Sequence, residues 1–274
     1  MHSLVHSPSH PAATPGHALG SPRLHDFFAE FFFFGRRRAT FQALAAPVGI
    51  QPGQRVLDVG CGTGYFARFI ATAVGNDGHV VGVDASMSMI EYARRKAART
   101  TNCGFQVGAA EALQVPNDGF DVVVSTLVMH HLPEDLRLRA LQEMRRVLHT
   151  GGHLLVVEAQ TPQHGLGWRL LAHAHGYDRM ARQVPHLEPL AAAAGFAEIR
   201  SGEAPPWLRY ITAVNAQMVD RSVGPGGLSL LRVASRQGVI AAPLAVNACK
   251  PLDANSQPRL FVNLAYHSTP RCFA

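Results

Sequence analysis

One segment constrains the fold of this 274-residue chain more than any other: residues 56–67, which read VLDVGCGTGYFA. An apolar, β-branched run is followed by three alternating glycines and then by a helix-like segment. Glycine allows the backbone to turn with a positive φ, and it lets a ligand approach where a Cβ would collide. A helix that begins at Gly64 would point its unpaired N–H groups and its positive dipole end toward that ligand. The segment therefore predicts a nucleotide-type pocket at the carboxyl end of a parallel strand.

The spacing around the glycines discriminates between kinds of nucleotide. The dinucleotide fingerprint is G-x-G-x-x-G, whereas here Asp58 stands two residues before Gly60 and the glycines follow as G-x-G-x-G. A carboxylate this close to the turn would repel a pyrophosphate, but it suits a ligand with a cationic amino-acid end. The segment resembles motif I of the class I S-adenosylmethionine (SAM)-dependent methyltransferases, most closely the small-molecule branch of ubiquinone/menaquinone-biosynthesis (methyltransferase type 11) enzymes. A glycine-rich turn in another α/β protein is the alternative.

Strand-like and helix-like segments alternate from residue 55 onward, as is typical of a doubly wound α/β fold. We expect strands at 55–59, 79–84, 105–107, 120–125, 153–158, 197–201 and 207–213, and helices at 65–74, 86–99, 135–148 and 186–194. The fold class is therefore α/β: a Rossmann-like, doubly wound, seven-stranded sheet, mostly parallel with one antiparallel edge strand, and with helices on both faces.

The pattern divides the chain into four parts. Residues 1–22 are rich in His, Pro, Ser and Ala and lack the features of a signal peptide, so we expect a disordered leader. Residues 23–54 are expected to form an N-terminal helical lid, and 55–214 the SAM-binding methyltransferase domain. Residues 215–274 form a C-terminal extension of weak periodicity, for which a small subdomain, an oligomer contact and irregular chain all stay open.

Two segments are candidates for a lid over the substrate. Residues 27–34 hold six phenylalanines, among them Phe31 and Phe34. A core or lid helix is the favoured interpretation, and contact with a membrane surface, with the arginines at 36–38 on lipid headgroups, is the alternative. Aromatic and histidine side chains also follow the fifth strand, and we expect a lid from Trp168, His173 and Tyr177. His173 and His175 would not share a helix face, so no metal site is expected there.

Asp84 ends the second expected strand, 20 residues after Gly64. Two vicinal ribose hydroxyls need an anionic acceptor of two hydrogen bonds, and the resemblance implies this role for Asp84. A dehydrogenase would place an acid similarly, so Asp84 alone indicates a ribose but not the cofactor. An aspartate that caps the next helix is the structural alternative. The resemblance implies further cofactor contacts from Cys61, Ala85 and Met89.

Two later segments resemble the same family. Residues 108–113 (GAAEAL) correspond to the segment along adenine, but Ala109 replaces the usual aspartate. Adenine would then depend on backbone groups of Ala110 and Glu111 and on apolar packing. Residues 119–133 resemble the fourth strand and its loop, which implies that Ser125 and Thr126 contact the methionine half of SAM.

Methyl transfer depends mainly on alignment of the acceptor with the methyl group. A general base is needed only where the acceptor carries a proton, and histidine is the natural candidate near neutral pH. His130 and His131 follow the fourth strand, where the family places groups that face the substrate. We slightly favour His131 as the base; the alternative is that both histidines only shape the loop.

Composition narrows the range of partners and locations. The net charge is +6, with basic clusters at 36–38 and 94–96 that indicate either an anionic partner or a solvated surface. No aromatic–basic motif accompanies them, and we expect no nucleic-acid partner. The four cysteines form no C-x-x-C pair, so neither a zinc site nor a disulfide framework is indicated and a cytoplasmic location is the default.

These features together predict a SAM-dependent methyltransferase that yields S-adenosylhomocysteine and acts on a small acceptor, apolar or aromatic, by O-, C- or N-methylation. The Asn/Asp-Pro-Pro-Tyr/Phe signature of amino-methylating nucleic-acid enzymes is absent after residue 124. A nicotinamide dehydrogenase is disfavoured by Asp58 and by the glycine spacing. A non-catalytic binding protein with the SAM fold is the alternative, because Ala109 and the C-terminal extension depart from the family.

Overall fold

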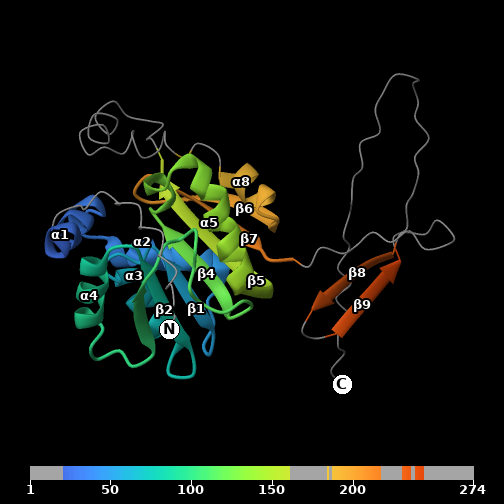
Figure 1. Cartoon of the computed structure of the whole chain (residues 1–274), viewed down its shortest axis with the longest axis horizontal. Coiled ribbons are helices and arrows are strands. Elements are labelled where there is room, and N and C mark those ends of the chain that lie inside the picture. The colour runs from blue at the N-terminus through green and yellow to red at the C-terminus, as the bar shows by residue number, and fades with distance from the viewer. Residues whose placement is uncertain (1–20, 161–183, 185–186, 217–229, 236–237, 244–274) are drawn as a thin grey trace, which may run out of the picture. The chain divides into compact units, whose positions relative to one another are not determined.

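The computed structural model describes residues 21–160, 184, 187–216, 230–235 and 238–243. The chain forms two compact units, Met1–Met218 and Val219–Ala274. The first unit holds every predicted motif, and its sheet and helices are labelled in Figure 1.

The first unit is built on a seven-stranded sheet in the order β3-β2-β1-β4-β5-β7-β6. The strands β1 to β5 are parallel, while β7 is antiparallel to both of its neighbours. The predicted α/β fold class is thus confirmed, and in detail the antiparallel strand lies one position in from the edge, with β6 outermost. The strands are β1 (Arg55–Val59), β2 (His79–Asp84), β3 (Cys103–Val107), β4 (Phe120–Thr126), β5 (Leu148–Ala159), β6 (Ala197–Ala204) and β7 (Leu208–Val214).

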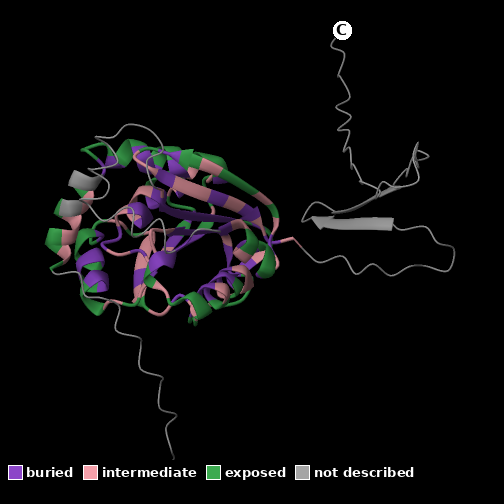
Figure 2. Ribbon diagram, turned by 90° about the horizontal axis from the view of Figure 1, so that it is seen from above, coloured by how far each residue is buried: buried purple, intermediate pink, exposed green. Residues whose placement is uncertain are grey.

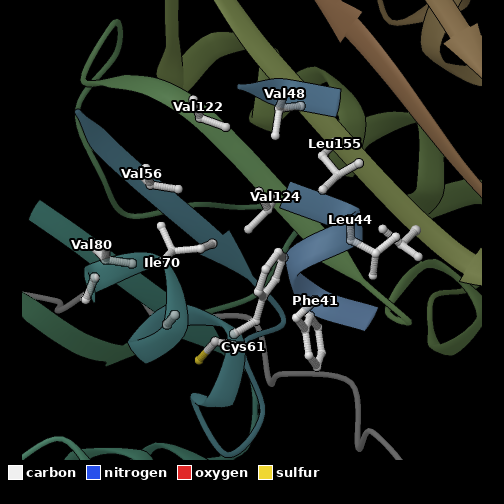
Figure 3. Close-up of a cluster of buried hydrophobic side chains, with 14 of the residues drawn as sticks. Phe41, Leu44, Val48, Val56, Cys61, Ile70, Val80, Val122, Val124 and Leu155 are labelled. Atoms are coloured by element: carbon white, nitrogen blue, oxygen red, sulfur yellow. The ribbon is translucent and has the colours of Figure 1, made fainter. Parts of the chain in front are cut away.

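Helices cover both faces of the sheet because successive residues of each buried strand point to opposite sides. In β1, Val56 packs in the cluster with α2 (Arg37–Ala45), α3 (Tyr65–Val74) and α4 (Met87–Lys96). Its neighbour Leu57 packs in the opposite cluster, with α5 (Glu134–Val147) and α8 (Leu187–Ala193). Figure 3 shows side chains of α2 and α3 gathered against β1, β4 and β5, and Figure 2 shows buried positions running along the strands.

The predicted N-terminal helical segment consists of α1 (Pro22–Phe32), α2 and a short 3-10 helix, η1 (Ala46–Val48). Helix α1 begins at Pro22, the last residue assigned to the leader; residues 1–20 lie outside the described residues. Phe33 and Phe41 are buried, and their ring centroids are 5.4 Å apart. Phe27 is 67% exposed and Phe34 is 47% exposed, so the phenylalanine-rich segment divides between core and surface.

The boundaries of several elements differ from those predicted. Helix α4 ends at Lys96 instead of residue 99, and β5 begins at Leu148, five residues before the predicted strand. The predicted bounds leave Gly151 and Gly152 between a helix that ends at residue 148 and a strand that begins at residue 153. Instead both glycines lie inside β5, where a Cβ on Gly152 would be 2.9 Å from the carbonyl oxygen of His149. Tertiary pairing with β4, which shifts register after Phe120, extends the strand through these residues.

In the second unit the structure describes one antiparallel hairpin, β8 (Leu230–Ser235) and β9 (Gly238–Pro243). Its register runs from Leu230 opposite Pro243 to Ser235 opposite Gly238. Apart from Asn215, Ala216 and this hairpin, the predicted extension at 215–274 lies outside the described residues.

Candidate active site

The candidate site lies at the carboxyl edge of the parallel strands, where β1 and β4 are neighbours. The chain leaves β1 into α3 on one face of the sheet and leaves β4 toward α5 on the other. This reversal is a topological switch point, where open α/β sheets form their ligand crevice. The predicted cofactor residues follow or end strands at this edge: Asp58, Gly60, Cys61, Gly62, Gly64, Asp84, Ala85, Met89, Ala110, Glu111, Ser125 and Thr126.

In the glycine turn after β1, Gly60 is closely packed, whereas Gly62 has more space around it. Gly60 has φ +75°, and a Cβ there would be 2.1 Å from Cγ2 of Val128, so the turn and the loop after β4 are in direct contact. A Cβ on Gly62, where φ is +51°, would have His25 as its nearest neighbour at 4.0 Å. The turn therefore fixes the β4 loop beside it and leaves its middle residue accessible to a ligand.

Asp84 ties the glycine turn to the end of β2. Its Oδ2 accepts a hydrogen bond from the backbone N–H of Gly62 at 2.9 Å, and its Oδ1 accepts one from the N–H of Ser86 at 2.9 Å. Ser86, the first residue of the helix predicted at 86–99, is the N-cap of α4. Asp84 thus holds the start of α4 in place, which agrees with the alternative role given above, that of an aspartate at the start of the next helix. Each carboxylate oxygen accepts up to about two hydrogen bonds, so capacity for a pair of hydroxyl donors remains.

Asp58 is an ionisable group buried without full compensation. The residue is 2% exposed, and its Oδ2 has no hydrogen-bond partner among the described residues. Burial, followed by the nearby charge of Asp84, raises the pKa of Asp58 from 3.8 to about 7. Ser125 Oγ and Thr126 Oγ1, at the end of β4, are likewise buried and unpaired. Unpaired polar atoms gathered at the glycine turn fit a ligand that carries a cationic, hydrogen-bonding amino-acid group.

Cys61 lies within the turn and is buried. Burial raises the pKa of its thiol well above the ordinary value, which keeps the thiol protonated and unreactive. This agrees with a packing role for Cys61. Cys61 and Cys103 are free thiols, and the other two cysteines lie outside the described residues.

The segment after β3 that resembles the adenine-binding segment is held by two residues of α5 that sequence reasoning missed. Glu143 accepts a hydrogen bond from the N–H of Leu113 at 2.9 Å. Arg146 donates to the carbonyl oxygens of Leu113, at 2.8 Å, and Val115, at 3.2 Å, and its Nε also bonds to Glu143. Opposite charges three residues apart on a helix were the available signal. These contacts fix the backbone of a segment in which Ala109 supplies no side-chain acceptor.

The two candidate histidines occupy different environments on η2 (Met129–His131), the 3-10 turn after β4. His130 is buried, and its Nδ1 lies 2.8 Å from Oε2 of Glu158, near the end of β5. The other oxygen of Glu158 accepts the N–H of Met129 at 2.7 Å. His131 is exposed, and its ring centroid is 4.0 Å from that of His130. Glu158 ends the predicted fifth strand, but its pairing with His130 depends on the alignment of β4 with β5.

Helix α1 is attached to the glycine turn through side chains that sequence reasoning also missed. Asp26 accepts hydrogen bonds from Oγ1 of Thr63, at 2.6 Å, and from Arg37, at 3.0 Å. Burial alone would raise the pKa of Asp26, but hydrogen bonds from Thr63, Arg37 and Tyr92 lower it. His25, next to Asp26, is the residue nearest to the open side of Gly62. The N-terminal helix thus lies against the candidate cofactor site.

Of the predicted lid residues, Phe34 makes an edge-on contact with Trp207, with ring centroids 5.8 Å apart. Phe31 lies in α1, but its side chain is outside the described part of the chain. Trp168, His173 and Tyr177 also lie outside the described residues.

Comparison with known proteins decides what kind of domain carries this geometry. A family model described as a methyltransferase domain matches residues 56–152. Residues 56–152 are thus similar to a methyltransferase domain. The demethylmenaquinone methyltransferase of Staphylococcus aureus strain MRSA252 is 31% identical over 138 residues, which cover 50% of this chain and 56% of that protein. The chain thus spans about half the length of the curated relatives it matches.

Solved structures share the fold of this methyltransferase domain. A SAM-dependent methyltransferase from Aquifex aeolicus has a TM-score of 0.54 at 19% identity, covering 69% of this chain and 96% of its own. Phosphoethanolamine N-methyltransferase 2 of Haemonchus contortus, solved in complex with SAM, has a TM-score of 0.51 at 18% identity, covering 65% of this chain and 52% of its own. The predicted resemblance to class I SAM-dependent methyltransferases is confirmed.

Among the described residues, no helix is both long enough and apolar enough to cross a membrane.

Proposed function

We propose that the protein transfers a methyl group from SAM to a small acceptor that is apolar or aromatic. The proposal rests above all on Asp58, a buried carboxylate with an unpaired oxygen beside an open glycine turn. A cationic amino-acid ligand would compensate this charge, and SAM carries an α-ammonium group together with its sulfonium. A neutral or anionic nucleotide end would leave Asp58 uncompensated, because burying an unpaired charge is costly.

In this proposal, different residues around the glycine turn bind different parts of SAM. Asp84 would accept the ribose hydroxyls, while Asp58 and the backbone of Gly60, Cys61, Gly62 and Gly64 would hold the methionine end. Ser125 and Thr126 would contact the methionine half from β4. Met89, which is buried, the backbone of Ala110 and Glu111, and Ala85 would line the adenosine side. SAM supplies an activated methyl group on its sulfonium when it is bound; the protein aligns the acceptor with it and excludes water.

The proposed acceptor class rests on two supports. The Staphylococcus aureus relative is named for a menaquinone precursor, a small molecule. Phe34, which follows α1, contacts Trp207, which directly precedes β7, and the two rings form an aromatic surface. Such a surface suits an apolar or aromatic acceptor. Phe31, Trp168, His173 and Tyr177 remain the other proposed lid residues. The acceptor atom, whether oxygen, carbon or nitrogen, and the cytoplasmic location remain predictions.

Calorimetric titration with SAM, S-adenosylhomocysteine and NAD tests the cofactor assignment directly. We expect SAM and S-adenosylhomocysteine to bind and NAD not to bind. Asp84→Ala should weaken SAM binding by at least about a hundredfold, because two charge-assisted hydrogen bonds of about 1.5–3 kcal/mol each are lost. Asp77→Ala is the matched control, since Asp77 is exposed in the turn between α3 and β2. Tight NAD binding without SAM binding would overturn the proposal.

A non-catalytic binding protein with the SAM fold is the second candidate, favoured by Ala109, where the family has an acid. Its signature would be SAM binding without any methyl transfer. A screen of phenols, hydroquinones and lipids with SAM labelled in the methyl group separates the two candidates. Label in any of these acceptors supports the enzyme, whereas its absence across all three classes favours the binding protein.

We also propose weak contact of α1 with a membrane surface, where an apolar acceptor would be concentrated. Phe27 and Leu24 are 67% and 49% exposed on this helix, and Arg36 and Arg38 are exposed just after it. Apolar side chains beside arginines suit an anionic lipid surface. Vesicles containing phosphatidylglycerol should pull down the protein, and Phe27→Ser should reduce the bound fraction severalfold. Equal binding of the variant would contradict this contact.

A further inference from the structure

Glu158 and His130 form a buried acid–histidine pair beside the candidate cofactor site. The side chains of His130 and Glu158 are 4% and 1% exposed, and their Nδ1 and Oε2 atoms are 2.8 Å apart. Both oxygens of Glu158 are engaged, since Oε1 accepts the N–H of Met129 at 2.7 Å. A carboxylate this deeply buried is stable only when its oxygens receive hydrogen bonds. Glu158 thus accepts hydrogen bonds from two donors of the turn that follows β4, the N–H of Met129 and Nδ1 of His130.

The chemistry of this pair fixes the position of a proton. An ionised carboxylate only accepts hydrogen bonds, so the Nδ1 atom that faces Oε2 must carry the hydrogen. In the neutral ring the other nitrogen, Nε2, is then left with its lone pair. Among the described residues no hydrogen bond to Nε2 is found. We propose that Glu158 is a positioning residue that holds His130 in the Nδ1–H tautomer, with Nε2 available as a general base.

The loop around His130 is held so that this orientation persists. Arg137 of α5 donates from Nε to the carbonyl oxygens of Met129, at 3.0 Å, and Leu132, at 3.1 Å. On the other side, Val128 packs directly on Gly60 of the cofactor turn. The backbone on both sides of His130 is therefore fixed, and the loop is joined to the turn that would hold SAM. His130 is buried against Glu158, whereas His131 is exposed, so we assign the base to His130 instead of the initially favoured His131.

The role of His130 as a base rests on the proposed function, whereas its tautomer does not. For a hydroxyl or phenol acceptor, the O–H bond breaks and its proton passes to Nε2 of His130. The acceptor oxygen forms a bond to the methyl carbon, the bond from that carbon to sulfur breaks, and its electron pair stays on sulfur. His130 becomes an imidazolium whose positive charge faces the Glu158 carboxylate. The products are the methylated acceptor and S-adenosylhomocysteine.

The tautomer can be measured on the full chain without an acceptor. In protein labelled with ¹⁵N-histidine, at about pH 8 where an ordinary histidine is neutral, long-range ¹H–¹⁵N spectra report which ring nitrogen is protonated. The His130 signals are assigned by their loss in His130→Gln. We expect protonated Nδ1 and unprotonated Nε2. A protonated Nε2 with bare Nδ1 in the unsubstituted protein would overturn the proposal, whatever the variants do.

Glu158→Gln tests the role of the carboxylate. The amide oxygen can keep the hydrogen bond from Met129, which turns the NH₂ group toward Nδ1 and forces Nδ1 to accept. The tautomer should therefore reverse to Nε2–H. Retention of the original tautomer would show that Glu158 does not set it and would contradict the proposal.

A second histidine–carboxylate pair provides the matched control. His149 Nε2 lies 2.9 Å from Asp121 Oδ1, also 28 residues away, and Asp121 Oδ2 accepts the N–H of Arg55. Asp121→Asn should alter the His149 signals and leave those of His130 unchanged. A change at His130 in this variant would mean that its tautomer responds to general destabilisation, and would overturn the assignment to Glu158.

Calorimetry separates failure of this inference from failure of the proposed function. Glu158→Gln should bind SAM as the unsubstituted protein does, because Glu158 is not placed among the cofactor contacts. With any phenolic acceptor found in the screen, kcat should fall at least about a hundredfold, the usual contribution of a general base, while SAM affinity is retained. Absence of SAM binding to the unsubstituted protein would sink the methyltransferase proposal but leave the measured tautomer standing.

Discussion

At the scale of single residues, Asp58 makes the stability of the cofactor-free protein depend on pH. Its pKa is raised from 3.8 to about 7 in the folded state, so between these values the folded state holds a proton that the unfolded state has lost. Stability must therefore fall as pH rises from about 4 to about 7. Above that range the cost levels off at roughly 4 kcal/mol, from about 1.4 kcal/mol for each pKa unit.

Asp58→Asn should remove this dependence, because an amide does not ionise. Urea unfolding at a series of pH values between about 4 and 7 measures the slope of the free energy of unfolding. The variant should lose most of the decline and be more stable than the original protein at neutral pH, yet bind SAM more weakly. Asp77→Asn, at an exposed aspartate, should keep the original slope. An unchanged slope in Asp58→Asn would show that the buried carboxyl does not titrate in this range.

At the scale of elements, the attachment of α1 to the glycine turn depends on one short hydrogen bond. Thr63 is 2% exposed, and its hydroxyl donates to Asp26 at 2.6 Å. Thr63→Val keeps the shape of the side chain but removes the donor. A hydrogen bond to a charged group contributes about 1.5–3 kcal/mol, so α1 should open at least about tenfold more often.

Amide hydrogen exchange measures this opening element by element. Exchange should accelerate in α1, while amides of β1 and β4 keep their protection because the core beneath them is unchanged. Thr72→Val is the control, since Thr72 is exposed on α3 and its hydroxyl bonds only within that helix, to the carbonyl oxygen of Arg68. Unchanged exchange in α1 of Thr63→Val would mean that Asp26 and Thr63 do not hold the helix in place.

The elements that sequence predicted best are those whose local patterns agree with their tertiary setting. The strand at 55–59 and the helix at 65–74 have the predicted bounds. Ser86 caps α4 as its chemistry indicated. The predicted start of β5 was wrong because pairing with β4 outweighed the local preference of Gly151 and Gly152 for a turn.

At the scale of the whole molecule, the sequence predicted the position of the candidate cofactor residues at one edge of the sheet, but not the contacts that support them. Asp58, Asp84 and the glycines lie at strand ends, and parallel strands bring their carboxyl ends to one edge whatever their order. The contacts of Asp26 with Thr63 and of Glu158 with His130 join residues 37 and 28 positions apart. No local pattern encodes such pairs, because they depend on how separate elements pack.

The sequence by itself determined the α/β class, the resemblance to a methyltransferase domain and the edge of the sheet at which the candidate cofactor residues lie, because alternating strands, helices and a glycine turn are local patterns with few tertiary solutions. Only the tertiary structure decided which histidine is held by a carboxylate, that α1 packs against the glycine turn, and which residues of α5 hold the segment at Ala109. Those outcomes depend on burial, which leaves Asp58 uncompensated and makes the partner of His130 decisive.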